Sequence, residues 1–386
     1  MTKLEELIKE LCPNGVEYVA LGKVTHLLRG KRLTKMQLLG DGKYPVYHGS
    51  LVPLGYYNEY NREGDTVIVV NTGGIGGVGY SETPFWCSDG CFCVANSPKI
   101  VNKYLYYVLV GYTDYLIART RVGGVPTIDQ ETVLSIQIPL PPLAVQREIV
   151  RILDKFTLYS QELAAELAAR KKQYEFYRDE LLRFQESYVE WKTIDEIAYF
   201  RRGSFPQPYT NLLWYGGEGA MPFVQVADVA EDGMRLVEHT KQTISKIAQP
   251  KSVFVKEGTV IVSLQGSIGR VALTQYDTYV DRTLAIFYGY KIEIDKKYFA
   301  YQLVRKFDIE KESARGSTIK TITKEEFSKF QIPVPPLAEQ KRIVAILDRF
   351  DTLCNDLSEG LPAEIERRQK QYEYFREKLL QFDKSL

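Results

Sequence analysis

Two stretches of the chain carry apolar residues at alternating intervals of four and three positions, which is the period of a coiled-coil helix. In residues 139–187 the seam runs from Ile149 through Leu153, Phe156, Ser160, Leu163, Leu167, Arg170, Tyr174, Tyr177, Leu181 and Phe184. In residues 333–386 it runs from Ile343 through Leu347, Phe350, Cys354, Leu357, Leu361, Ile365, Arg368, Tyr372, Phe375, Leu379 and Phe382. Each stretch is predicted to form a long helix of roughly 65–70 Å, at about 1.5 Å per residue.

The segments before these helices, residues 16–138 and 188–332, have a different pattern. Short apolar runs followed by glycine-rich turns, TVIVV at 66–70 and TVIVS at 259–263, predict buried strands. Residues 103–119 and 297–313 look helical, and residues 1–15 contain a short amphipathic helix, LEELIKEL. The predicted fold class is therefore two α/β (α+β) domains separated by two long antiparallel coiled-coil helices.

The chain contains an internal duplication. PLPPLAVQREIVRILDKF at 139–156 and PVPPLAEQKRIVAILDRF at 333–350 share twelve of eighteen residues at an offset of 194. Further on, RKKQYEFYRDELLRF at 170–184 matches a second-copy segment at an offset of 198, so the second copy has four extra residues. Four residues preserve the seam as a stutter. Gly360 and Pro362 lie at this point, where we expect a kink or break.

A lone helix cannot bury such a seam, so the two long helices are expected to pack against each other within one chain. Antiparallel packing would place Leu153, Leu163, Tyr174 and Leu181 opposite Leu347, Leu357, Tyr372 and Leu379. A coiled coil between two chains is the alternative. The short N-terminal helix, through Leu4, Leu7, Ile8 and Leu11, is expected to dock near the end of the second long helix and bring the termini together.

Composition narrows the function classes. Fifty Lys and Arg residues face 49 Asp and Glu residues among 386, so any nucleic-acid binding must come from local patches rather than net charge. No apolar run approaches the ~18 residues that span a bilayer, and the N-terminus lacks the pattern of a signal peptide. Five unevenly spaced cysteines favour a reducing, cytoplasmic location over a disulfide framework.

The repeated P-x-P-P-L-A-x-Q motif, with each helix ending in QYE and an aromatic-Arg-x-x-Leu-Leu run, resembles the helical regions of type I restriction–modification specificity subunits. The resemblance covers essentially the whole chain. It implies two target-recognition domains, each binding one half of a bipartite site in double-stranded DNA. It also implies that the helices set the spacer and dock two methyltransferase subunits, with restriction subunits joining through the complex. A chain of this kind has no catalytic activity, and S-adenosylmethionine, ATP and Mg are expected on the partner subunits.

Basic residues beside glycines are the candidate DNA contacts, because Arg and Lys on loops bind phosphates and read guanine. They occur in similar places in both domains: Arg29, Lys31, Arg32, Arg119 and Arg121 in the first, and Arg201, Arg202, Arg270, Arg315 and Lys320 in the second. Solvated surface charge is the alternative for each of them. The tyrosines Tyr44, Tyr47, Tyr56, Tyr57 and Tyr60 either line the DNA face or, as we favour, pack a loop-rich domain.

The remaining motifs give weaker evidence about function. Residues 74–79 fit G-x-G-x-x-G, but Pro84 follows too soon for the helix that a dinucleotide site requires, and the second copy loses the spacing. Cys87, Cys91 and Cys93 lack the spacing of a zinc site and are interpreted as buried apolar residues. Three scattered histidines suggest neither a metal nor a catalytic site. Two rival functions remain open, a stand-alone DNA methyltransferase and a coiled-coil scaffold without a DNA role.

Overall fold

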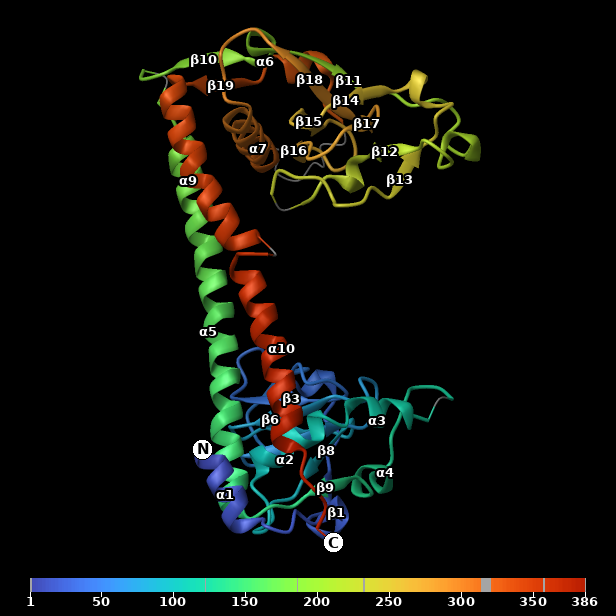
Figure 1. Cartoon of the computed structure of the whole chain (residues 1–386), viewed down its shortest axis with the longest axis vertical. Helices are drawn as coiled ribbons and strands as arrows, with labels where there is room; N and C mark the ends of the chain where they lie inside the picture. The colour runs from blue at the N-terminus through green and yellow to red at the C-terminus, as the bar shows by residue number, and fades with distance from the viewer. Residues whose placement is uncertain are drawn as a thin grey trace. The chain divides into compact units, whose positions relative to one another are not determined.

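The computed structural model describes residues 2–121, 123–185, 187–231, 233–313, 321–356 and 358–385. The chain separates into two compact units, whose elements are labelled in Figure 1. The first unit comprises Met1–Leu163 and Ile365–Leu386, and the second comprises Ala164–Glu364. Each unit therefore combines one mixed α/β domain with parts of both long helical segments. No helix in the described residues is long and apolar enough to cross a membrane.

The first domain is built on an antiparallel sheet of strand order β2-β8-β5-β6, and a smaller sheet has the order β4-β3-β7. The strands are β1 (Tyr18–Ala20), β2 (Leu27–Arg29), β3 (Tyr44–Tyr47), β4 (Gly55–Tyr57), β5 (Thr66–Val70), β6 (Val78–Ser81), β7 (Trp86–Cys87), β8 (Cys91–Val94) and β9 (Gln137–Pro139). The helices of this domain are α1 (Lys3–Leu11), α2 (Asn102–Val110), α3 (Thr113–Ala118) and α4 (Gln130–Leu134).

The second domain repeats this topology, with sheets of order β11-β18-β15-β16 and β13-β12-β17-β14. The strands are β10 (Glu190–Thr193), β11 (Ala198–Arg202), β12 (Met221–Val224), β13 (Gln242–Ile244), β14 (Val253–Val255), β15 (Val260–Ser263), β16 (Val271–Leu273), β17 (Thr278–Val280), β18 (Leu284–Tyr290) and β19 (Gln331–Val334). Its helices are α6 (Ile194–Ile197), α7 (Lys296–Ser313) and α8 (Lys324–Ser328). The fold class predicted from the sequence is confirmed.

The apolar runs at 66–70 and 259–263 form the inner strands β5 and β15, as predicted, and every residue of both strands is buried. The predicted helix at 297–313 is α7. The predicted single helix at 103–119 is wrong, because α2 ends at Val110 and α3 starts at Thr113. Gly111 lies at the break, and glycine costs about 1 kcal/mol in a helix interior.

The long helices are α5 (Leu143–Leu182), α9 (Leu337–Asn355) and α10 (Leu361–Leu380). In the first unit the ring of Phe156 on α5 stacks on Phe375 of α10, with centroids 5.3 Å apart. In the second unit Tyr177 of α5 stacks in the same way on Phe350 of α9, at 5.8 Å.

The start of α5 therefore packs against the end of the second helical segment, and the end of α5 packs against its start. This confirms the antiparallel seam within one chain. Leu153 shares a cluster with Tyr372 and Leu379, and Leu347 shares one with Tyr174 and Leu181. Two predicted seam positions remain: Leu163 is half-buried, and Leu357 lies outside the described residues.

The second helical segment breaks between Asn355 and Leu361, as the four extra residues and Gly360 predicted. A Cβ atom on Gly360 would lie 2.5 Å from the carbonyl oxygen of Thr352 and 2.7 Å from that of Asp356. Since real Cβ atoms do not approach oxygens so closely, only glycine fits where the chain leaves α9.

The N-terminal helix docks where predicted. Leu4 is buried, and Leu7 and Ile8 pack in the same cluster as Leu379 and Leu380 of α10. Leu11 was predicted to join them but is 40% exposed, because the helix ends there and Cys12 turns inward instead.

Backbone hydrogen bonds hold the two ends of the chain together. The N–H of Val16 donates to the carbonyl of Asp383 at 2.8 Å, and the N–H of Ser385 donates back to Val16 at 3.1 Å.

Each domain is fixed to the start of a long helix by a buried glutamine. The side-chain oxygen of Gln146 accepts the N–H of Val101 at 2.8 Å, one residue before α2. Its nitrogen donates to the carbonyls of Pro141, at 2.7 Å, and Lys99, at 3.2 Å. In the second unit Gln340 accepts the N–H of Asp295 at 2.9 Å and donates to its own proline, Pro335, at 2.8 Å. The repeated P-x-P-P-L-A-x-Q motif is therefore a structural joint.

Tyrosines reinforce this joint in the same way in both units. Tyr104 of α2 donates its hydroxyl to the carbonyl of Pro139, and Tyr298 of α7 donates to Pro333. One turn further along α2, Tyr107 donates to Asp154 of α5 at 2.6 Å. The equivalent pair in the second unit is Tyr301 and Asp348, at 3.3 Å. Because several bonds join two helices at different points, each domain is held in a fixed orientation on its helix.

We predict that Gln146→Leu lowers the free energy of unfolding of the first unit by about 2–5 kcal/mol. The substitution leaves the Val101 N–H and the Pro141 carbonyl buried without partners, at about 1–3 kcal/mol each. Urea unfolding followed by far-UV circular dichroism measures the change. Gln161→Leu, at an exposed position of the same helix, is the matched control. Equal urea unfolding midpoints for the Gln146→Leu and Gln161→Leu variants would contradict the stabilising role of the Gln146 joint.

Candidate nucleic-acid interface

The candidate basic loop of the first domain follows β2, and its path depends on Gly30. A Cβ atom on Gly30 would overlap the carbonyl group of Ser88, so no other residue fits without moving the backbone. The N–H of Lys31 donates to the carbonyl of Cys87 at 2.9 Å, which holds the loop against the strand-to-strand connection of residues 87–91. Arg29, Lys31 and Arg32 all have exposed side chains here.

The second domain builds the same loop after β11. The N–H groups of Gly203 and Ser204 donate to the carbonyls of Leu284 and Val280, at 3.0 and 3.1 Å. A Cβ atom on Gly203 would overlap the Val280 carbonyl, as in the first domain. Arg202 therefore occupies the place of Arg29, and the Arg-Gly pair recurs because the backbone requires glycine there.

A second candidate segment comes beside this loop in each domain. In the first, the N–H of Ile128 donates to Asn71 at 3.0 Å, and Arg29 and Arg121 line one cavity of about 410 Å³. In the second, the N–H of Ile322 donates to Leu264 at 3.0 Å, and the Arg202 guanidinium donates to the Ile322 carbonyl at 3.1 Å. In the first domain the structure thus brings together two basic residues, Arg29 and Arg121, that lie 92 positions apart in sequence.

Charged partners limit what each arginine can do. Arg121 forms an ion pair with Asp129 at 2.6 Å. The backbone N–H of Thr132 donates to Asp129, and this bond, with Arg121 nearby, lowers the pKa of that carboxyl. The guanidinium of Arg119 lies 3.6 Å from the ring centroid of Tyr115 and remains exposed. The candidates Arg315 and Lys320 lie outside the described residues.

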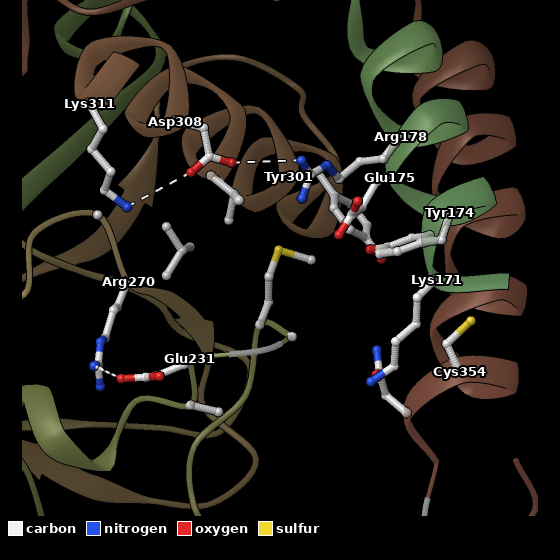
Figure 2. A pocket seen from close by; sticks show the side chains of 17 residues that line it. Lys171, Tyr174, Glu175, Arg178, Glu231, Arg270, Tyr301, Asp308, Lys311 and Cys354 are labelled. Carbon is white, nitrogen blue, oxygen red and sulfur yellow. Dashed lines mark hydrogen bonds and ion pairs between the residues drawn. The ribbon is translucent and has the colours of Figure 1, made fainter. Parts of the chain in front are cut away.

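Arg270 differs from the other candidates because its guanidinium is engaged within its own domain. It donates to the carbonyls of Val226 and Val229, the latter at 3.1 Å, and pairs with Glu231. This pair lines a cavity of about 390 Å³ between α5, α7 and the second domain (Figure 2).

A second carboxylate of this cavity is also paired. Asp308 lies between Arg178, at 3.7 Å, and Lys311, at 3.8 Å (Figure 2). Burial raises the pKa of Tyr174 to about 12 and raises the pKa of the Cys354 thiol. The cavity therefore has the properties of a domain-to-helix junction, and these two groups are not activated as nucleophiles.

Arg282 is a candidate that we did not identify from the sequence. It is exposed, and its guanidinium lies 5.4 Å from the centroid of the Tyr209 ring. It lies in the connection between β17 and β18. The carbonyls of Val280 and Leu284 at the two ends of this connection accept the hydrogen bonds of the Gly203 loop. The signal was available, because aligning residues 279–287 with 86–94 places Arg282 opposite Asp89.

The glycine-rich segment at 74–79 is a tight turn between β5 and β6, which leads into a strand rather than a helix. Gly76 has a φ of +91°, and a Cβ atom there would lie 2.7 Å from Ile117 of α3. Gly269 in the second copy has a φ of +79° and lies equally close to Phe307 of α7. The recurring glycine serves helix-to-turn packing.

Cys87, Cys91 and Cys93 are fully buried in an apolar cluster with Ile68, Val70 and Phe85. Burial raises the pKa of Cys91 to about 11, so its thiol is not a ready metal ligand at neutral pH. Among the described residues, no group of three or more His, Cys, Asp or Glu side chains is placed to hold a metal ion.

The tyrosines of the first domain divide into two sets. Tyr47 packs edge-on against Phe85 and Tyr57 against Trp86, at 5.5 and 5.3 Å, so both have structural contacts. Tyr56 and Tyr60 remain 44% and 43% exposed.

Comparison with known proteins decides the family. The family model described as the type I restriction modification DNA specificity domain matches residues 13–170 and again residues 187–367. The chain belongs to the type I restriction–modification specificity subunits. This confirms the resemblance based on the repeated proline–glutamine motif.

Named relatives span the whole specificity subunit. The EcoR124I/EcoR124II specificity subunit of Escherichia coli is 39% identical, over 100% of this chain and 98% of that protein. A putative specificity subunit of Haemophilus influenzae is 30% identical, over 99% and 98%. The crystal structure of an S subunit from M. genitalium has the same fold, with a TM-score of 0.59 at 16% identity over 95% and 96% of the two chains.

We predict that the five cysteines of the native specificity subunit react slowly with Ellman's reagent at pH 8, and that all react once the protein is unfolded in urea. All five are free and buried, so the reagent cannot reach the thiolates. Chelation with EDTA should leave the melting temperature unchanged. Zinc in the purified protein, together with a lower melting temperature after chelation, would instead favour a metal site at the Cys87–Cys93 cluster.

Proposed function

We propose that the two domains of this specificity subunit are target-recognition domains, each of which binds one half of a bipartite site in double-stranded DNA. The observation that carries the proposal is the repeated loop pair. In the first domain the glycine-dependent loop with Arg29 lies beside the segment that carries Arg121, and in the second domain Arg202 of the equivalent loop donates to the carbonyl of Ile322. Phosphate contacts position such loops, and side chains that reach base edges give the specificity. The contacts are expected from Arg29, Lys31, Arg32, Arg119, Arg121, Arg201, Arg202, Arg270, Arg315 and Lys320, with Arg282 added.

The long helices, in this proposal, set the distance between the half-sites and dock two methyltransferase subunits. Two copies of one helical sequence offer two similar surfaces. The buried glutamine joint supports this role, because a spacer can measure distance only if each domain is fixed on its helix. Restriction subunits join through the same complex.

We infer further that the chain performs no chemistry itself and depends on partner subunits for S-adenosylmethionine, ATP and Mg. A DNA methyltransferase acting alone and a coiled-coil scaffold without DNA contacts are the rival functions. The ion pairs of Arg270 with Glu231 and of Arg178 with Asp308, together with the buried thiols, favour a binding role over the first. The basic loops of the two domains favour a DNA-binding role over that of a coiled-coil scaffold without DNA contacts.

We predict that the subunit, assembled with its methyltransferase partner, directs methylation of one bipartite motif. Replacing residues 188–332 with the corresponding segment of a related subunit should change only one half of that motif, since the two domains have separate cores. Sequencing of the methylated DNA reads both halves. The chain without its partner should transfer no labelled methyl group from S-adenosylmethionine. Transfer by the isolated chain would establish the first rival, and a change in both halves would contradict independent recognition.

We predict that inserting a second copy of Glu162–Ala165 into α5 lengthens the preferred spacer by about one or two base pairs and leaves both half-sites unchanged. Four residues add about 6 Å and rotate the helix by roughly 400°, so the seam stays nearly in phase. One base pair rises about 3.4 Å. The second helical segment already carries four extra residues, so the pair tolerates this change. A variant that assembles but keeps the original spacer would show that the helices do not measure the distance.

A further inference from the structure

The second domain carries a groove that combines cations with aromatic rings and has a volume of about 640 Å³. Its lining residues come from β11, β14 and β18, from the turn after β14, and from Lys296 at the start of α7. The cations are Arg201, Lys256 and Lys296, and the rings are Phe254, Phe287, Tyr288 and Tyr290. No carboxylate is among the described residues that line it. One of its cations, Arg201, is also among the candidate DNA contacts predicted from the sequence.

The groove side chains are available to a ligand. Arg201, Lys256 and Lys296 are exposed, and Tyr288 is 63% exposed. Lys296 has a hydrogen bond to the carbonyl of Gly258 at 3.2 Å, which leaves its charge uncompensated by that partner. The Tyr290 hydroxyl oxygen is buried without a hydrogen-bond partner within the described chain. A strip of positive charge beside exposed rings is complementary to a sugar–phosphate strand.

The first domain does not repeat six of these side chains. The repeat supplies the equivalent positions, because Gly203 matches Gly30, Tyr298 matches Tyr104, and TVIV recurs at 66–69 and 259–262. The residues equivalent to Arg201, Lys256, Lys296, Phe254, Tyr288 and Tyr290 are Leu28, Glu63, Asn102, Asn61, Ala95 and Ser97. None of these is basic or aromatic, and one is acidic. The duplication preserved the frame of the domain while this surface became different.

We propose that this groove holds a phosphate strand of the DNA that flanks the half-site of the second domain. The second domain then supplies more of the sequence-independent affinity than the first. The inference rests on the proposed DNA-recognition function and adds a division of labour between the two domains. A groove that binds phosphates affects cognate and non-cognate DNA alike, since phosphates carry no sequence information.

The test uses the subunit assembled with its methyltransferase partner, a duplex with the methylated motif, and a scrambled duplex of equal length. The double variant Lys256→Gln, Lys296→Asn removes two groove cations. The double variant Lys241→Gln, Lys329→Gln removes two exposed cations of the same domain outside the groove. Each is compared with the wild-type complex by measuring the affinity for both duplexes from low to moderate salt.

We expect the groove variant to lower the slope of log affinity against log salt by about 1.8, at about 0.9 per lost phosphate contact. At 0.15 M salt this corresponds to roughly 30-fold weaker binding of both duplexes, while the methylated motif stays the same. Tyr288→Ala should weaken binding without changing the slope, because it removes a ring and no charge.

The proposal is overturned if the groove variant and the control variant share one slope. It is also overturned if the groove variant no longer co-elutes with the methyltransferase subunit, since the groove would then be a protein-docking surface. Failure of the proposed function has a different signature. In that case the wild-type complex itself would not distinguish the motif duplex from the scrambled one.

Discussion

One buried amide at the start of each long helix determines how this specificity subunit is put together. The side chain of Gln146 closes the proline turn before α5 and also accepts a backbone N–H from the segment leading into α2. Gln340 forms the equivalent hydrogen bonds, which join the proline turn before α9 to the segment leading into α7. Tyrosine hydroxyls and apolar contacts join the domain to the helix as well, but the glutamine is the group that ties the proline turn itself to the segment leading into the domain helix. A buried polar group left without a partner costs free energy, so these hydrogen bonds strongly favour one orientation of the domain on its helix.

This joint explains why the duplication is so uneven in sequence. The helical segments share twelve of eighteen residues at their start because proline, glutamine and the seam residues all have specific partners. The domains diverged because their frame depends on backbone hydrogen bonds and on a few glycines, such as Gly30 and Gly203, which exclude every larger side chain. Side chains on the connecting loops can change without disturbing that frame. A DNA-reading protein requires this separation, since new specificity must not unfold the domain.

Much of the fold could be predicted from the sequence pattern. An apolar seam of period 3.5 indicates a coiled-coil helix, and a short run of β-branched residues indicates a buried strand. The break at Gly360 was predictable from a change of offset between repeats. The exposure of Leu11 and the break at Gly111 were missed, because the apolar pattern continues through both points and does not mark where each helix ends. For the candidate site, the loops were predictable but their electrostatics were not. Arg270 is engaged by Glu231, 39 residues away, and only the folded chain reveals such a partner.

The near balance of positive and negative charge in the whole chain affects how strongly it can attract DNA. A net charge of +1 gives little long-range attraction for DNA, so affinity depends on where the cations lie. In the first domain Arg121 is compensated by Asp129, and Glu63 stands where the second domain has Lys256. In the second domain the groove cations have no carboxylate beside them among the described lining residues. Two domains with one fold therefore differ in the charges that they place at equivalent positions.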